Sequence, residues 1–217
     1  MMISPEGYYE ECLKGKSEAE ILQEISSLKE EISRLKQVLE QDKMDPELMI
    51  KPDPLTRIKC DRDFLKMAKK TLEEAGGRYE PTDEEQRDQS FNADLTSMRK
   101  FVLEINKFEG DFRTYTYTLS EDKKTFDVDY ILFPKPSELP EVELFIKDEF
   151  LRGIAGLHIG EWKKRYENPY VLDGTQWIVS IAYEDGREPV QIHGSNAYPY
   201  NFRGLIEFLE IDGGEYP

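Results

Sequence analysis

Apolar and polar residues alternate towards the C-terminal end of the chain in a way that predicts a β-hairpin. Residues 177–183 read as one strand and residues 190–193 as the strand that returns. Asp185-Gly186 between them is a preferred pair for a two-residue turn, because both central positions of that turn need positive φ. Pro189 has no N–H to donate, so the returning strand is expected at the edge of its sheet.

The turn implies a register that can be checked against the hydrophobic pattern. It places Glu184 opposite Arg187 as a charge pair and makes one face of both strands apolar. A shift by one residue would turn every apolar side chain to the other face. The expected cross-strand neighbours are Ile181 and Val190, Val179 and Ile192, Trp177 and Gly194, Ser180 and Gln191, and Ile178 and His193.

A short amphipathic helix is predicted directly after the hairpin. Asn201 is a suitable N-cap residue, and apolar residues then recur with helical spacing. The connection 194–199 is rich in residues that form turns. It is either a ligand-contacting loop or, as we favour, a connection whose polar side chains bond their own backbone. The apolar positions of the helix are Phe202, Leu205, Ile206 and Leu209.

The clearest periodicity in the chain lies between residues 17 and 42. Ser17 and Glu20 form a capping-box pattern at a helix start. Apolar residues then alternate spacings of four and three, as the a and d positions of a coiled coil do. The a positions are Ile25, Ile32 and Leu39, and the d positions are Ile21, Leu28 and Leu35.

Two interpretations of this apolar stripe are open. Ile at a with Leu at d favours a parallel dimer, in which Glu24 would face Lys29 and Glu31 would face Lys36 of the other chain. The pattern covers only about three heptads, so the helix can instead pack its stripe on the body of its own chain. We favour self-association and therefore expect a homodimer.

Three further strands are predicted at residues 100–105, 113–119 and 126–133. Their alternation indicates an antiparallel meander with one solvated face. Asp127 and Asp129 fall on that face. Paired carboxylates can bind a divalent cation, but a polar stripe facing solvent explains them without a partner.

These patterns predict an α+β fold, with an antiparallel sheet of about five strands, helices on one face and a coiled-coil-like helix before it. Residues 1–45 form the helical segment and residues 56–212 the α+β domain, with helices near 62–75 and 141–155. Residues 78–90 are polar and acidic, and are expected to form an exposed loop or a short polar helix.

Charge and composition narrow the classes of partner and location. The net charge of −16 disfavours binding to nucleic acid or to anionic membranes. The start of the chain lacks a basic region followed by an apolar one, and no long apolar run follows, so neither a signal peptide nor a membrane span is expected. Cys12 and Cys60 have no metal-ligand spacing, which is typical of free thiols in the cytoplasm.

The chain contains no motif that assigns chemistry. The glycines at 153, 156 and 160 match neither dinucleotide-binding nor Walker spacing. The run from His158 to Trp162 lacks the second histidine of a zinc-protease helix, and His193 is the only other histidine. We therefore predict no catalytic residues, no metal and no cofactor.

Aromatic residues are unusually frequent, and some could line a groove for a peptide or a small ligand. Core packing is the more common role of aromatic residues at strand spacing. The aromatic residues for which both roles are open are Tyr115, Tyr117, Trp162, Trp177, Tyr198 and Tyr200, and we favour the core. The residues that a ligand site around the 195–200 loop would use are Ser195, Asn196, Tyr198, Tyr200, Trp177 and Trp162.

Three C-terminal segments carry a resemblance to a known group of sequences. They are Leu157 to Trp162, Leu172 to Trp177 (LDGTQW), and Gly194 to Phe202 (GSNAYPYNF). Together they resemble an uncharacterised family of small bacterial proteins, chiefly from Firmicutes. The resemblance covers about the last 60 residues, implies a cytoplasmic bacterial protein and brings no known activity.

Taken together, the patterns favour a non-catalytic binding or interaction protein that self-associates through its N-terminal helix. The alternative is a small-ligand-binding protein or an enzyme that uses the loop Ser195–Tyr200 and nearby aromatic residues. A third hypothesis, an antitoxin or a nucleic-acid mimic, would need the carboxylates to be concentrated on one face. Another protein or a peptide is the expected partner besides a second copy of the chain.

Overall fold

The computed structural model describes residues 3–41, 51–108, 110–135, 144–171 and 173–211. The chain divides into two compact units, one up to Pro81 and one from Thr82 onward. The boundary that the sequence suggested between residues 45 and 56 therefore lies inside the first unit. The reason is that the helix from Pro54 to Glu74 packs along the N-terminal helix.

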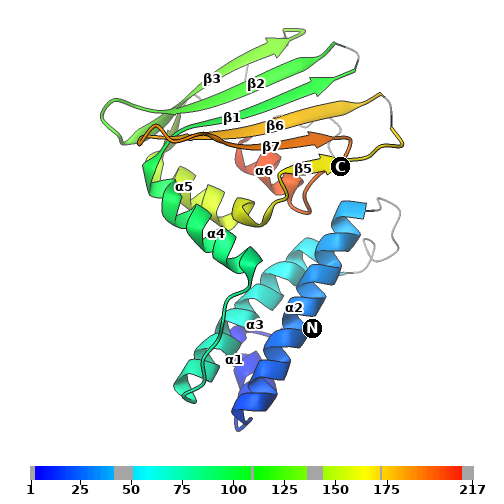
Figure 1. Ribbon diagram of the computed structural model, residues 1–217, viewed down its shortest axis with the longest axis vertical. Coiled ribbons are helices and arrows are strands. Elements are labelled where there is room, and N and C mark those ends of the chain that lie inside the picture. Colours follow the sequence, from blue (N-terminus) through cyan, green and yellow to red (C-terminus); the bar gives the residue numbers. More distant parts are fainter. Residues whose placement is uncertain (1–2, 42–50, 109, 136–143, 172, 212–217) are drawn as a thin grey trace. The chain divides into compact units, whose positions relative to one another are not determined.

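The N-terminal unit consists of helices (Figure 1). The long helices α2 (Glu18–Gln41) and α3 (Pro54–Glu74) pack along each other, and the short segments α1 (Pro5–Tyr8) and η1 (Tyr9–Leu13) precede them. The backbone N–H of Ser17 donates to the Glu20 carboxylate at 2.8 Å, as the capping pattern predicted. Asp53 caps α3 by accepting a hydrogen bond from Thr56 N at 3.1 Å.

The apolar stripe of α2 is buried within the single chain. Five of its six residues are at most 8% exposed, and the sixth, Leu39, is half-buried. They face a stripe on α3 that includes Ile58, Leu65 and Leu72. Glu31 of α2 also pairs with Arg57 of α3. The structure thus uses the stripe for contact within the chain, and a parallel dimer through the same residues would require α3 to leave it. The five buried residues are Ile21, Ile25, Leu28, Ile32 and Leu35.

The C-terminal unit contains one mixed sheet of seven strands in the order β4-β3-β2-β1-β6-β7-β5. The predicted meander is confirmed as β1 to β3, and the α+β class is confirmed. The sheet has two more strands than the five expected, and β5 runs parallel to β7. The strands are β1 (Met98–Lys107), β2 (Phe112–Leu119), β3 (Thr125–Phe133), β4 (Leu144–Ile146), β5 (Arg165–Glu167), β6 (Thr175–Tyr183) and β7 (Val190–Ser195).

The predicted hairpin is β6–β7, and every residue pair of its expected register from Trp177–Gly194 to Ile181–Val190 is confirmed. The turn differs from the prediction. Gly186 alone has positive φ (+74°), and its N–H bonds to the Tyr183 carbonyl oxygen at 3.4 Å. Arg187 pairs with Asp94 and Asp185, and Glu184 pairs with Lys123, in place of the expected Glu184–Arg187 pair. The strand β7 lies inside the sheet because the short strand β5 forms the edge.

The structure of the segment before α5 differs from the helix that the sequence predicted there. Residues 144–146, which were expected to be helical, form the short strand β4 beside β3. The helix α5 begins only at Lys147 and ends at Gly156. Phe145 and Ile146 alternate between half-buried and exposed, as strand residues do. Residues 141–143 of the predicted helix lie outside the described residues.

Helices α4 (Asp83–Asp94), α5 and α6 (Phe202–Phe208) cover one face of the sheet (Figure 1). The core lies between them and the inward side chains of the strands. Phe150 of α5 packs against Phe126 at 4.6 Å between ring centroids, and Trp177 of β6 packs against Phe202 of α6 at 4.7 Å. The predicted helix after the hairpin is thus confirmed, with its apolar positions in the core.

Candidate functional site

The connection between β7 and α6 uses its polar side chains on the backbone. Asn196 adopts a left-handed conformation (φ 53°), its Oδ1 accepts from Thr175 N at 2.8 Å, and its Nδ2 donates to the Val171 carbonyl at 3.2 Å. Tyr198 stacks on Trp177, whose Nε1 donates to the Ala197 carbonyl at 2.9 Å. These contacts support the structural interpretation of the connection over the ligand-contacting one.

The six residues of the expected ligand site are divided between the core and the two faces of the sheet. Trp162 and Trp177 are at most 6% exposed and pack in the core. Trp162 Nε1 donates to Asn201 Oδ1 at 2.9 Å, and Asn201 Nδ2 donates to the Leu157 carbonyl. Asn201 holds the N-cap position of α6, but its side chain makes no capping hydrogen bond. Its amide is used instead for the contacts with Trp162 and Leu157. Tyr200 points its hydroxyl to Glu161, while Ser195 lies on the other face of the sheet.

Ser195 lines a pocket of about 260 Å³ on the face of the sheet that carries no described helix of this unit. The pocket also contains His193 of β7, with Arg165 and Glu167 of β5. Its volume lies just below the range of roughly 300–1,000 Å³ typical of small-molecule sites. Its other lining residues are Asn106, Tyr166, Gln176, Trp177, Ile178 and Gly194.

The same open face carries apolar side chains at the β2–β3–β4 end of the sheet. Phe112 faces Phe133 across β2 and β3, and their rings stack at 5.7 Å. Leu144 of β4 lies opposite Asp127 of β3, so it belongs to the same face. We call the five exposed apolar residues of this face the outer patch: Phe112, Ile131, Phe133, Leu144 and Ile146, which are 40% to 62% exposed.

Asp127 and Asp129 are both exposed, and the register places them on the same face as the outer patch. The solvated face predicted for the meander is therefore confirmed. Thr116 and Thr118 of β2 are their cross-strand neighbours. The paired carboxylates thus lie on an open surface that also carries hydroxyl and apolar groups.

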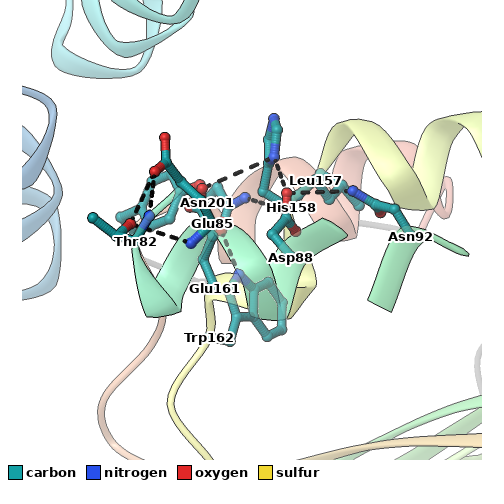
Figure 2. A network of polar contacts seen from close by, with 10 residues as sticks. Thr82, Glu85, Asp88, Asn92, Leu157, His158, Glu161, Trp162 and Asn201 are labelled. Atoms are coloured by element: carbon teal, nitrogen blue, oxygen red, sulfur yellow. Dashed lines mark hydrogen bonds and ion pairs between the residues drawn. The ribbon is translucent and has the colours of Figure 1, made fainter. Parts of the chain in front are cut away.

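A second candidate site lies on the helical side of the C-terminal unit, where α4 meets the turn around η4 (Ile159–Glu161) (Figure 2). His158 Nδ1 lies 2.7 Å from Asp88 Oδ2 and 4.0 Å from Glu161 Oε1. Asn92 Nδ2 donates to Asp88 Oδ2 at 3.3 Å, and the Tyr200 hydroxyl donates to Glu161 Oε2 at 3.1 Å. We call Asp88, His158 and Glu161 the α4–η4 cluster.

Local backbone structure holds the α4–η4 cluster in place. Thr82 and Glu85 form a complete capping box at the start of α4, which sets the first turn before Asp88. His158 adopts a left-handed conformation (φ 50°) and begins the tight turn to Glu161, whose N–H bonds back to the His158 carbonyl at 3.0 Å. Gly160 touches α4 so closely that an added Cβ would lie 2.5 Å from Asp88 Cα.

Sequence reasoning missed Asp88. The stretch 78–90 was expected to be an exposed loop or a short polar helix. The capping pattern at Thr82 and Glu85 was the available signal for a helix start. Even so, nothing in the sequence indicates that Asp88 meets His158, because seventy positions separate them.

Comparisons with known proteins identify no relative of this chain. No family model, curated protein or solved structure matches the chain. The resemblance of the three C-terminal segments to a bacterial family stays a prediction. No helix among the described residues is long and apolar enough to cross a bilayer.

Proposed function

We propose that this chain is a non-catalytic binding protein that docks a partner protein on the open face of its C-terminal sheet. The observation that supports the proposal is the outer patch, where five large apolar side chains stay exposed on one face of three adjacent strands. The register divides the patch into two groups, Phe112, Ile131 and Phe133 towards one end of β3 and Leu144 and Ile146 towards its other end, with Asp127 and Asp129 between them. Large apolar groups left exposed on one face of a folded domain are typical of interaction surfaces.

The chemistry around the outer patch favours a particular kind of partner. Asp127 and Asp129 lie on the same face, and the whole chain carries a net charge of −16. A second copy would bring the same carboxylates against this face, which costs free energy through repulsion. We therefore propose a partner segment with apolar anchor residues flanked by lysine or arginine.

The α2 stripe is a weaker basis for binding. Its residues already form the contact with α3, so self-association through them competes with the fold of the N-terminal unit. The homodimer through the N-terminal helix stays a prediction. Its test is the molar mass by light scattering at micromolar concentration.

The experiment compares partner capture by three forms of the full chain. The patch variant carries Ile131→Ser and Phe133→Ser, and the matched control carries Tyr170→Ser and Val171→Ser, which remove apolar groups that are also exposed but lie away from the three strands. Thermal unfolding confirms that all three fold alike. Cross-linking in a native lysate, followed by binding of the captured segment as a synthetic peptide, supplies the readout.

The expected result is a peptide that binds the wild type and the control, carries basic residues beside its apolar anchors, and loses affinity for the patch variant by at least about tenfold. Its affinity should also fall as salt is raised. Equal binding by the patch variant and the control would refute the proposal, and so would a partner segment that is acidic.

A further inference from the structure

The α4–η4 cluster brings together the side-chain types that bind metal ions. One ligand atom each from Asp88, His158 and Glu161 lies within 4.8 Å of the others. We infer that this cluster is a binding site for one divalent transition-metal ion, with Zn²⁺ as the ion that its ligand set suits best. The inference is independent of the proposed docking surface, which lies on the opposite face of the sheet.

The spacing of the ligand atoms agrees with coordination to a single ion. Ligands at about 2.0–2.2 Å from a tetrahedral ion lie roughly 3.3–3.6 Å from one another. The observed separations from His158 Nδ1 are 2.7 Å to Asp88 Oδ2 and 4.0 Å to Glu161 Oε1, on either side of that range. The Asp88 and Glu161 oxygens lie within 4.8 Å of each other, so side-chain movements of about 1 Å would place all three ligand atoms around one ion.

Two neighbouring side chains already orient the carboxylates. The Tyr200 hydroxyl donates to Glu161 Oε2 at 3.1 Å, while Oε1 of the same carboxylate lies nearer to His158. Asn92 Nδ2 donates to Asp88 at 3.3 Å, from one turn along α4. Such outer hydrogen bonds to ligating carboxylates are a regular feature of protein metal sites.

Burial around the cluster is uneven in a way that suits an ion. The side chains of Asp88 and Glu161 are each 11% exposed, whereas the His158 side chain is 33% exposed. Two nearly buried carboxylates lie side by side here, and a divalent ion bound between them would offset the cost of burying their negative charge. The more exposed imidazole leaves a route by which the ion enters, and water can complete the coordination.

A further buried atom points to a polar occupant. Among the described residues, Asn92 Oδ1 is buried and accepts no hydrogen bond. A buried amide oxygen without a donor is unfavourable, and a metal-bound water within its reach would supply that donor. The Nδ2 of the same amide group is the atom that donates to Asp88 at the border of the cluster.

The donor atoms select the class of metal. One imidazole nitrogen with two carboxylate oxygens matches the ligands of Zn²⁺ and of related first-row ions. Mg²⁺ and Ca²⁺ prefer oxygen ligands alone, and no thiol belongs to the cluster. The expected order of affinity is therefore Zn²⁺ well above Mg²⁺ and Ca²⁺.

The test measures Zn²⁺ binding to the full chain by calorimetry, in a background with Cys12→Ser and Cys60→Ser that removes both thiols. The binding variants are Asp88→Asn and Glu161→Gln, which keep side-chain shape and can keep their hydrogen bonds to Asn92 and Tyr200. The control is His193→Ala, because it removes the only other histidine and lies in the pocket on the open face.

We expect one Zn²⁺ per chain, unchanged in His193→Ala and weakened at least about 100-fold in Asp88→Asn and Glu161→Gln. Saturating Zn²⁺ should raise the melting temperature of the background chain and of His193→Ala but not that of the two binding variants. A Co²⁺ complex should show the weak visible bands of nitrogen and oxygen ligands.

Two outcomes would overturn the inference. No Zn²⁺ binding by the folded chain would mean that Asp88 and His158 only join α4 to η4. Zn²⁺ binding that survives in both binding variants would place the ion elsewhere. The melting temperature of each variant without metal shows whether it is folded. If a variant does not fold, the Co²⁺ spectrum and the ion selectivity of the background chain decide between the outcomes.

Discussion

Replacing Asp61 by Asn should stabilise the N-terminal unit at neutral pH and have much less effect in mild acid. Asp61 lies half-buried on α3. Burial and the nearby charge of Glu31 raise the pKa of Asp61 to about 6, although Arg57 acts in the opposite direction. A carboxyl with a raised pKa favours folding when protonated. That contribution is complete below its ordinary pKa of 3.8 and is lost as the pH rises through 6.

The size of the effect follows from the difference between the two pKa values of Asp61. The rise from 3.8 to about 6 corresponds to about 3 kcal/mol, since a pKa change of one is worth about 1.36 kcal/mol. Solvent screens a half-buried group, so about half of that, ~1.5 kcal/mol, is a realistic gain for Asp61→Asn at pH 7.5. At pH 4.5 the same linkage leaves about 0.5 kcal/mol.

Urea unfolding followed by circular dichroism at both pH values measures this gain. The matched control is Asp63→Asn, two residues further along α3 and exposed to solvent. It should change the free energy of unfolding by less than about 0.5 kcal/mol at either pH. A gain from Asp61→Asn that is equal at the two pH values, or a loss at pH 7.5, would refute the reasoning.

Three further predictions concern packing and capping. Gly194→Ala should destabilise the C-terminal unit by several kcal/mol, because a Cβ there would lie 2.0 Å from the Trp177 ring, and thermal unfolding followed by tryptophan fluorescence measures it. Leu35→Ala, at a side chain with 0% exposure, should cost about 2–5 kcal/mol in urea unfolding, whereas Leu22→Ala, with 39% exposure on the same helix, should cost under about 1 kcal/mol. Thr82→Ala removes the capping box of α4 and should cost about 1 kcal/mol, with Thr96→Ala as the control outside the box. Equal losses of stability for Leu35→Ala and Leu22→Ala would contradict the burial of Leu35, and equal losses for Thr82→Ala and Thr96→Ala would contradict the capping box.

Local periodicity was sufficient to predict much of the secondary structure. The alternation in residues 177–193 specified the register of β6 and β7, since a slip by one residue would have exposed Val179 and Ile181. The spacing of the α2 stripe specified a buried helix face in the same way. Neither pattern identifies what covers that face, because a partner chain and α3 bury the same apolar area.

Long-range pairing explains the remaining differences. Strand β5 joins the sheet beside β7 through three residues, too few to show a periodic pattern. The candidate metal ligands are split between α4 and η4, and their meeting depends on the close approach at Gly160. The sequence shows His158 and Glu161 close together but no second histidine beside them. The third candidate ligand, Asp88, comes from a distant helix, so local spacing could not reveal it.

The strand order also affects how the sheet can assemble as the chain is synthesised. Strands β2 and β3 can pair with β1 as soon as they emerge, but the other neighbour of β1 is β6, which arrives some seventy residues later. Until then the long inner strand of the sheet has an unsatisfied backbone edge beside Phe101 and Leu103. Unpaired edges of this kind promote aggregation. Chains truncated before residue 175 should therefore accumulate in the insoluble fraction.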